Sequence, residues 1–375
     1  MKTTSKISER LRIAIEADTP IVVQLTEQLT WLIASGMISV GETLPPIRQL
    51  ADEIGVHMHT VREAYHRLEA ANLVSIRTRT GTIVLPLGSE SFAREGTDLR
   101  SFLIGVLVPG PAAIYQPFIQ GIQEASLPYG WMPLVAYTQD NPFLTQRYTH
   151  QLIAKQVDGL IVTSPGEIAR FESTVHSEHL PPIVYADAPH IAMDSVSPNS
   201  EQAGYRATRH LVEHGYSSIG IITAPLDWEN VEPCYLGYKR AFEAAGLSLD
   251  PELVIEVPDF HPHSGYEGAM RLMGVDKPPE AVFVVADELA FGTMQACREL
   301  ELEIPEDLAI ASYGDVEAAA ITDPALTTAH IPAYEMGCEA VERLQALFSG
   351  VVEEYAPLFL DCPLIIRRSC GCGPG

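Results

Sequence analysis

The stretch PPIRQLADEIGVHMHTVREAYHRL, residues 45–68, decides the fold of the N-terminal region. Its apolar residues recur at helical spacing in two separate runs, Ile47, Leu50, Ala51, Ile54 and then Val61, Ala64, Tyr65, Leu68. Gly55 lies between the runs and predicts the end of the first helix. Two short helices joined by a tight glycine-containing turn indicate a helix-turn-helix, so residues 57–60 should lead into a DNA groove.

The flanking segments make the pattern more specific. DTPIVVQLTEQLTWLIASGMISVGETLPP lies upstream (18–46), and LEAANLVSIRTRTGTIVLP lies downstream (68–86). Together, residues 18–85 resemble the DNA-binding domain of the gluconate-repressor (GntR) family of bacterial regulators. The matching positions are Gln24, Ser35-Gly36, Gly41, Leu44-Pro45, Arg48, Leu50-Ala51, Gly55-Val56, Thr60-Val61-Arg62, Ala64, Leu68 and Gly81-Thr82. The resemblance implies a winged helix-turn-helix, with a first helix from Pro20 to about Ala34 and short β segments at 73–77 and 82–85.

This resemblance also implies which residues contact DNA. Arg48, Thr60, Arg62 and the wing around Gly81 should reach phosphates or bases, although both arginines also fit the role of ordinary solvated helix residues. The chain departs from the family at 57–59, where His-Met-His replaces a turn that usually carries arginine. An arginine that could bind guanine with two hydrogen bonds is therefore missing from this turn. The predicted DNA-binding residues are Arg48, His57, Met58, His59, Thr60, Arg62, Arg77, Arg79 and Gly81.

The charge of the chain is distributed unevenly. The net charge is −25, yet residues 1–85 hold nine Lys/Arg and nine Asp/Glu, while the other 290 residues hold 15 and 40. We therefore expect the head to bind DNA through a few placed arginines, with a small salt dependence. The chain contains no apolar run of 18 residues and no apolar signal segment at its start, and its six cysteines are scattered. These features predict a cytoplasmic protein with reduced thiols and no membrane contact.

Residues 86–101, PLGSESFAREGTDLRS, have the composition of an interdomain linker. From residue 102 onward, apolar runs alternate with helical patterns, which predicts an α/β fold with parallel sheets. The expected strands are 102–108, 157–162, 182–187, 218–223, 253–257, 281–286 and 308–313. The expected helices are 115–127, 143–156, 199–214, 235–245, 264–273, 287–300 and 333–348.

This second region resembles the effector domain of the lactose/galactose-repressor (LacI/GalR) family, which is similar to periplasmic sugar-binding proteins. The resemblance is carried by stretches in the family order, among them IGVLVP, QVDGLIV, NSEQAGYRATRHLVEHGYSSIGIIT, GYKRAFEAAGL, DELAFGTM, IPEDLAIASYGD and PALTTAHIP, within residues 104–332. It implies a ligand-binding domain over 102–369 with two subdomains, 102–194 plus 331–356 and 195–330 plus 357–369. A tail at 370–375 follows. The fold class is thus α/β, with a winged helix-turn-helix joined to a two-subdomain, periplasmic-binding-protein-like effector domain.

The same resemblance implies an effector cleft. Carboxylates and an aromatic face suit a polyhydroxylated ring, because they accept hydroxyl hydrogens and cover its C–H face. Asp287 also fits the role of a helix N-cap, and Phe260 that of a core residue. Two polar handles common in the family are missing, an arginine at Cys234 and an aspartate at Gly314, so a less polar ligand remains an alternative. The predicted effector-binding residues are Ile114, Tyr115, Asp187, Asn230, Cys234, Phe260, Asp287 and Asp315.

We expect neither a metal nor a cofactor. The pairs His57/His59 and His261/His263 lack cysteine or carboxylate partners at zinc spacing. His210 and His214 are spaced i, i+4 within a stretch that matches a structural helix of the family. Cys370-Gly-Cys372 is interpreted as a mobile tail, although such a pair also suits redox or metal chemistry.

The function expected from the sequence is that of a homodimeric, ligand-responsive regulator that binds double-stranded operator DNA. We expect a repressor of carbohydrate-utilisation genes with a sugar-like effector. Some GntR heads are fused to an aminotransferase-like enzyme, and such an enzyme would need a lysine within a cofactor-binding fold. This reading is disfavoured, because the lysines after the linker, Lys155, Lys239 and Lys277, all lack a Ser-x-x-Lys context. The alternative regulators are one with a non-sugar ligand and one whose effector domain only dimerises.

Overall fold

A computed structural model describes residues 7–11, 13, 20–34, 37–70, 73–77, 81–85, 101–139, 141–163, 180–188, 194–351 and 356–372. The predicted linker lies outside this part of the chain, except for Ser101. The chain divides into two compact units. One takes the described residues of Met1–Gly110, Ser126–Ile183 and Leu347–Val351, and the other takes those of Pro111–Ala125, Val184–Ala346 and Val352–Gly375. Within the described ranges, every helix is too short or too polar to span a lipid bilayer.

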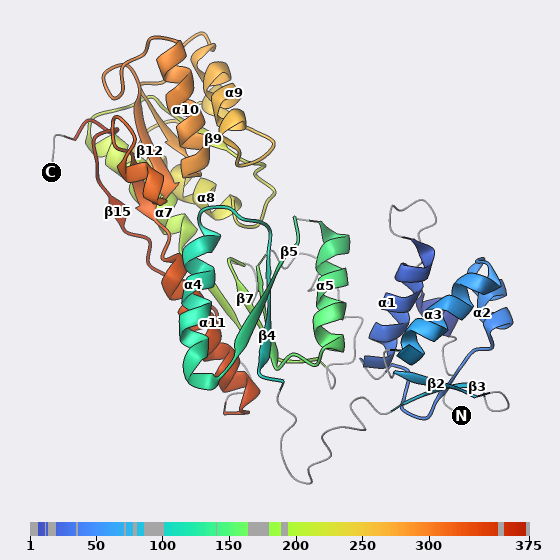
Figure 1. The fold of residues 1–375 in the computed structure, drawn as a ribbon. Helices are drawn as coiled ribbons and strands as arrows, with labels where there is room; N and C mark the ends of the chain where they lie inside the picture. The colour runs from blue at the N-terminus through green and yellow to red at the C-terminus, as the bar shows by residue number, and fades with distance from the viewer. Residues whose placement is uncertain are drawn as a thin grey trace. The chain divides into compact units, whose positions relative to one another are not determined.

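The N-terminal head is a winged helix-turn-helix (Figure 1). Its small antiparallel sheet has the strand order β1-β3-β2. The elements of the head are a 3-10 turn (Ile7–Arg10), α1 (Ile21–Ala34), β1 (Thr43–Leu44), α2 (Ile47–Ile54), α3 (Met58–Ala70), β2 (Val74–Arg77) and β3 (Gly81–Val84). The predicted helices and wing strands are confirmed, and β1 is an additional short strand.

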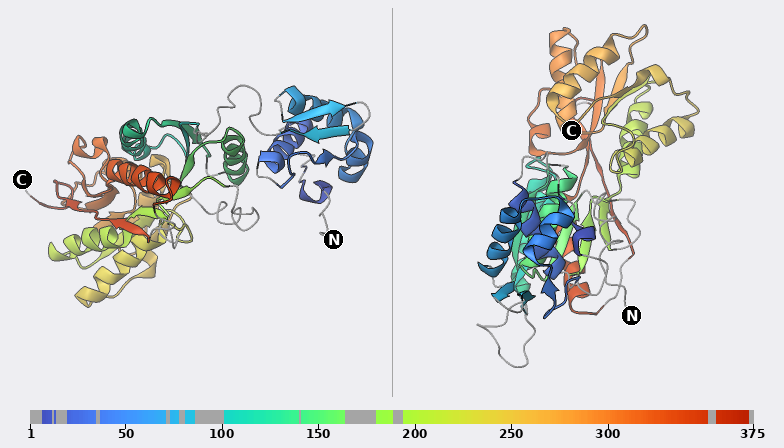
Figure 2. Two further views of the ribbon diagram at one scale, coloured as in Figure 1. Left: turned by 90° about the horizontal axis from the view of Figure 1, so that it is seen from below. Right: turned by 90° about the vertical axis from the view of Figure 1, so that its right-hand side faces the viewer.

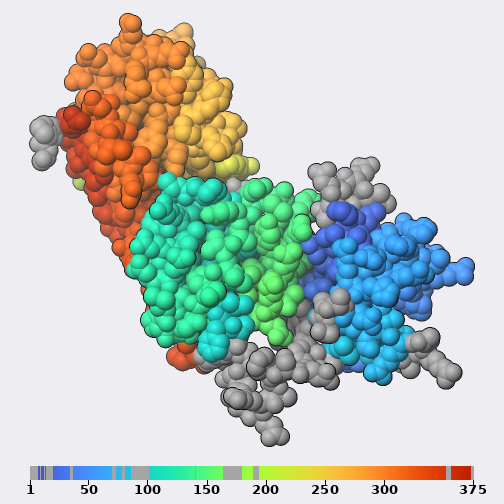
Figure 3. Space-filling view, in the orientation of Figure 1, coloured from blue at the N-terminus to red at the C-terminus, as the bar shows by residue number. Residues whose placement is uncertain are grey.

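The apolar spacing of the sequence builds the core of this head. All four residues of the second run are buried, as are Leu50 and Ala51 of the first, and they pack with leucines of α1. The hydroxyl of Tyr65 donates a hydrogen bond of 2.7 Å to the carbonyl of Pro45, which ties α3 to the start of α2. Burial of the apolar sides of α2 and α3 leaves their other faces in contact with solvent (Figure 3).

The region after the linker contains two six-stranded sheets. The first has the order β14-β8-β7-β6-β4-β5, and the paired strands with a described register run parallel. Its strands are β4 (Leu103–Val108), β5 (Met132–Tyr137), β6 (Gly159–Thr163), β7 (Ile183–Ala186), β8 (Ser195–Pro198) and β14 (Leu358–Leu360). Strands β8 and β14 belong to this sheet, although the boundaries drawn from the sequence place their residues in the other subdomain.

The second sheet has the order β10-β9-β11-β12-β13-β15 and lies wholly in the second unit. It is parallel except for β15, which pairs antiparallel with β13. Helices cover both faces, with α7 and α8 on one and α9 and α10 on the other (Figures 1 and 2). The strands are β9 (Ile219–Thr223), β10 (Val254–Glu256), β11 (Ala281–Val284), β12 (Ala309–Gly314), β13 (Thr327–His330) and β15 (Leu364–Ile365).

All seven helices expected after the linker are present within a few residues of their predicted bounds. They are α4 (Tyr115–Ser126), α5 (Pro142–Ala154), α7 (Ser200–Glu213), α8 (Glu232–Ala245), α9 (Pro262–Met273), α10 (Asp287–Glu299) and α11 (Ala333–Phe348). Further 3-10 turns lie at Leu127–Tyr129, Pro251–Leu253 and Glu317–Ala320.

Five strands in these sheets were not predicted, and their composition gives the reason. β8 and β13 carry buried serine and threonine rather than an apolar run, as in SVSP and TTAH. β5 lies at a sheet edge and exposes Met132 and Tyr137. β14 and β15 are only three and two residues long. A search for continuous apolar runs therefore fails to detect them.

Candidate DNA-binding surface and effector site

The exposed face of α3 and the adjoining part of α2 carry most of the predicted DNA-binding residues. Thr60 is partly buried, and Met58 exposes 44% of its surface although it is apolar. Among the described residues, no acidic side chain pairs with Arg48 or Arg62, whereas Arg67 on α3 is paired with Glu63 at 3.2 Å. The exposed members of the predicted set on these helices and the turn before α3 are Arg48, His57, Met58, His59 and Arg62.

His57 directly precedes α3 and caps its N-terminal end. Its Nδ1 accepts a hydrogen bond of 3.2 Å from the backbone N–H of His59, and its carbonyl accepts one of 2.9 Å from Thr60. The ring thus acts as a helix cap, although histidine is not among the residues preferred at this position. In this conformation Nε2 is the ring nitrogen that remains for a ligand.

The wing places two further predicted residues opposite each other. Arg77 ends β2 and pairs in register with Gly81 at the start of β3, and both are exposed. Arg79, which lies between them, falls outside the described residues. The side chain of Glu69 accepts a hydrogen bond of 2.8 Å from the N–H of Ile76, which fixes the wing to the end of α3.

In the second unit, the structure brings together three of the predicted effector residues. Asp187 follows β7 in a left-handed conformation with φ of 53°, and Asn230 donates a side-chain hydrogen bond to it. Burial raises the pKa of Asp187 to about 7, although the hydrogen bond from Asn230 acts in the opposite direction. A carboxylate with such a pKa retains its proton through much of the range below neutrality, so it can donate or accept a hydrogen bond.

Cys234 lies beside this pair and joins a buried polar cluster. Its thiol donates to the carbonyl of Ser200 at 3.4 Å, and the hydroxyls of Ser200 and Tyr313 are 2.9 Å apart. Burial is the main cause that raises the pKa of both Cys234 and Tyr313, and the negative charge of Asp187 adds to each. Sequence reasoning missed Ser200 and Tyr313, because nothing in the local pattern distinguishes them from core residues.

Phe260 lies beside a second aromatic residue that sequence reasoning also missed. The rings of Phe260 and Trp228 meet edge to face, with centroids 5.6 Å apart, and Trp228 is 36% exposed. Trp228 and Asn230 share the segment that follows β9, and Phe260 follows the neighbouring strand β10. The carboxyl ends of parallel strands meet at one edge of a sheet, where ligands of α/β proteins bind.

Asp287 has a structural environment. It is fully buried, and it is the first residue of α10, so the N-cap position belongs to Ala286 and not to Asp287 as the alternative reading supposed. One carboxylate oxygen accepts from the backbone N–H of Val316 at 2.9 Å, and the other from the hydroxyl of Thr328 at 2.7 Å. Burial raises the pKa of Asp287 against these hydrogen bonds. Its carboxylate holds the loop after β12 in place.

Asp315 is likewise engaged within the protein. Its two oxygens contact Arg367 at 2.6 Å and His330 at 3.0 Å. Burial alone would raise the pKa of Asp315, but hydrogen bonds from His330 and Arg367 lower it, and the same contact raises the pKa of His330. An effector would have to displace one of these partners to reach the Asp315 carboxylate.

Ile114 and Tyr115 lie at the start of α4, also in the second unit. Ile114 is half-buried, and Tyr115 is buried with its ring 6.4 Å from that of Phe118, in an edge-to-face arrangement. These contacts give Tyr115 a packing role.

Comparisons with known proteins agree with the two-part architecture. The family of bacterial regulatory proteins, gntR family, matches residues 22–84, and the periplasmic binding protein-like domain family matches residues 208–370. The HTH-type transcriptional repressor PurR of Haemophilus influenzae (strain PittEE) is 32% identical over 272 residues, which cover 71% of this chain and 80% of that protein.

Solved structures share the fold of the effector region. The complex of transcriptional regulator CelR with cellobiose has a TM-score of 0.65 at 22% identity, over 87% of this chain and 99% of that one. A LacI family transcriptional regulator from Enterococcus faecium with bound ribose has a TM-score of 0.64 at 24% identity, over 71% and 98%. These relatives are transcription regulators rather than enzymes. The chain therefore belongs to the LacI family of DNA-binding transcription regulators and carries a GntR-type helix-turn-helix domain at its N-terminal end.

Proposed function

We propose that this regulator is a cytoplasmic repressor of carbohydrate-utilisation genes, which binds operator DNA as a homodimer and responds to a sugar-like effector. The observation that carries the effector class is the pair Asp187–Asn230, with the exposed Trp228 and its partner Phe260 at the carboxyl edge of the second sheet.

A sugar ring requires the groups that these residues supply. Its hydroxyls need hydrogen-bond acceptors and donors, which Asp187 and Asn230 provide, and its C–H face packs on aromatic rings. Cellobiose and ribose bound to two regulators of the same fold support this class. Asp287 and Asp315 are not included in the proposed site, because their oxygens already bind protein groups.

DNA recognition is assigned to α3, the adjoining part of α2 and the wing. Arg48 and Arg62 are exposed and have no described acidic partner, so they can contact phosphates or bases. Met58 and His57 would face base edges at the N-terminal turn of α3, the part of a recognition helix that enters the major groove. Homodimerisation would place two such helices on a pseudo-palindromic operator.

The test is a thermal-shift screen of the whole chain against pentoses, hexoses, deoxysugars and disaccharides, because a ligand that binds only the folded state raises the melting midpoint. We expect at least one sugar to raise the melting midpoint of the parent chain. The same sugar should not raise the midpoint of Asp187→Ala but should raise that of Asp276→Ala, which replaces an exposed carboxylate of the same unit. A sugar hit that survives Asp187→Ala would refute this site. No hit in the whole panel would refute the sugar class.

A further inference from the structure

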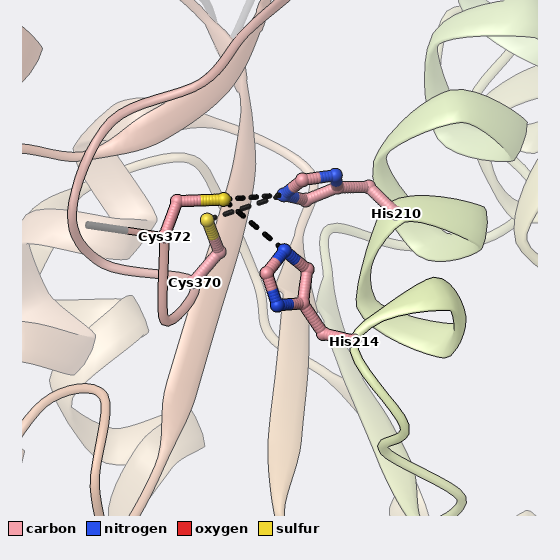
Figure 4. Close-up of side chains that lie close together, drawn as sticks. All are labelled: His210, His214, Cys370 and Cys372. Carbon is pink, nitrogen blue, oxygen red and sulfur yellow. Dashed lines mark hydrogen bonds between the residues drawn. The ribbon is translucent and has the colours of Figure 1, made fainter. Parts of the chain in front are cut away.

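Four metal-ligating side chains from distant parts of the sequence converge in the second unit. His210 and His214 lie at the C-terminal end of α7, and Cys370 and Cys372 lie in the segment after β15 (Figure 4). One potential ligand atom from each residue lies within 4.8 Å of all the others. The two pairs are about 160 positions apart, which is why zinc-motif spacing did not join them.

Three of the distances between ligand atoms are close to the edges of one zinc tetrahedron, in a cluster whose ligand atoms all lie within 4.8 Å of one another. His210 Nε2 lies 3.2 Å from the sulfur of Cys370 and 3.7 Å from that of Cys372, and His214 Nε2 lies 3.1 Å from the sulfur of Cys372. Zinc bonds of about 2.3 Å to sulfur and about 2.0–2.1 Å to nitrogen give a tetrahedron with edges of about 3.3–3.8 Å. Two cysteines and two histidines are a common closed zinc ligand set.

The helix pre-positions the two histidines. Their i, i+4 spacing places both rings on one face of α7, with ring centroids 4.6 Å apart. The backbone N–H of His214 donates to the carbonyl of His210 at 3.1 Å, so helical geometry persists to the last ligand. The residue that ends the helix thus has a defined orientation.

The cysteine segment is also held in place, in contrast to the mobile tail expected from the sequence. Cys370 is fully buried, and the Ser369 hydroxyl accepts from the N–H of Thr327 at 2.8 Å and donates to the carbonyl of Ile310 at 2.7 Å. Gly371 has a φ of 95°, and a Cβ there would lie 3.1 Å from the hydroxyl of Tyr216. Glycine is therefore required for the close passage between the two cysteines.

The sulfur of Cys370 already contacts His210 and Thr327, and its deprotonated form is the one that would bind a metal ion. The Thr327 hydroxyl donates to the sulfur at 3.1 Å.

We propose that His210, His214, Cys370 and Cys372 bind one Zn²⁺ that fastens the C-terminal segment to α7. All four positions of the tetrahedron are protein ligands, which is the arrangement of structural rather than catalytic zinc. His214 is exposed and Cys372 is partly exposed, so the ion can enter from solvent, while Cys370 anchors the site in the interior. The site is independent of the proposed effector and of DNA binding.

The first experiment measures metal binding by the untagged full chain. After dialysis against chelator and then buffer, titration with Co²⁺ should produce the visible absorption of tetrahedral cobalt and a sulfur-to-cobalt charge-transfer band. Both should saturate at one ion per chain, and Zn²⁺ should abolish both. Mass spectrometry under native conditions should show one bound zinc.

The variants test the ligand assignment. Cys372→Ser and His214→Ala should each weaken zinc binding at least about 100-fold, more than loss of an outer-shell partner costs. Because His214 is exposed, its alanine variant should fold even if a variant of buried Cys370 does not. The matched controls are Cys338→Ser on α11 and His263→Ala on α9, which should bind zinc as the parent chain does.

Three outcomes would overturn the proposal. They are a parent chain that binds no zinc or cobalt under reducing conditions, a His214→Ala variant with unchanged affinity, and a Cys370–Cys372 disulfide that persists after reduction and metal addition. The last would be detected as failure of both thiols to alkylate after the chain is denatured in chelator, which removes any metal that would itself protect them.

Discussion

Asp187→Asn should stabilise the unliganded protein, and the gain should increase with pH. The folded-state pKa of about 7 lies above the ordinary aspartate value of 3.8, so the folded chain keeps a proton that the unfolded chain loses. The stability that depends on this protonation is fully present below about pH 4 and is lost as pH rises through about 7. Asparagine carries no charge at either pH and avoids the loss.

The magnitude follows from the shift. About three pKa units correspond to about 4 kcal/mol between the fully protonated and fully ionised limits. Between pH 5 and pH 8, the parent chain should lose about 2–3 kcal/mol relative to the variant. For a unit of this size, that equals a relative change of about 5–10 °C in the melting midpoint.

The assay is differential scanning fluorimetry of the full chain at pH 5, 6, 7 and 8, with Asp276→Asn as the control because Asp276 is exposed. The midpoint of Asp187→Asn minus that of the parent should grow steadily with pH, and the control should show a flat difference. A constant or shrinking difference for Asp187→Asn would refute the claim that this carboxyl is protonated in the folded protein near neutrality.

Three further outcomes concern other parts of the molecule. Arg62→Ala should weaken operator binding by about 1–3 kcal/mol. Arg67→Ala should change operator binding little, because Arg67 is already paired with an acidic residue of α3. Equal losses for the two variants in a mobility-shift titration would contradict the assignment. Arg367→Met should lower the midpoint of thermal unfolding, because it leaves the half-buried Asp315 without its closest cation. The free energy of unfolding should fall by roughly 3 kcal/mol. An unchanged midpoint would show that the ion pair contributes nothing to stability. Gly237→Ala should destabilise the chain, since the added Cβ would lie 2.0 Å from the carbonyl oxygen of Glu201 on α7. If the variant were as stable as the parent chain in urea unfolding, α7 and α8 would have to move apart at no cost in free energy.

Local sequence patterns predicted secondary structure best for helices that bury one apolar face and for strands that are buried on both faces. The apolar periods of 45–68 gave α2 and α3, and the continuous apolar runs after residue 102 gave the central strands. Such patterns work because each buried side chain must recur with the period of its own element. Strands made of buried serine and threonine, such as β8 and β13, escaped this logic because their polar groups are satisfied by residues outside the strand itself.

The candidate sites divided in the same way. The residues on the exposed face of α3 were predictable, because a helix fixes the directions of its own side chains. The environment of Asp187 was not, because its hydrogen bond comes from Asn230 on another segment and its pKa depends on burial. The role of Asp287 depended on Val316 and Thr328, and the role of Asp315 depended on Arg367, and all three partners are distant in the sequence.

The sequence by itself determined the two-part architecture, the helix-turn-helix and the order of the α/β elements, since all of these follow from spacing along the chain. Only the tertiary structure decided which polar side chains meet. It brought His210 and His214 to Cys370 and Cys372 because α7 and the C-terminal segment both lie against the second sheet. There the sulfur of Cys370 accepts a hydrogen bond from Thr327 of β13. Proximity of this kind depends on how strands are ordered in a sheet, and spacing along the chain carries no record of that order.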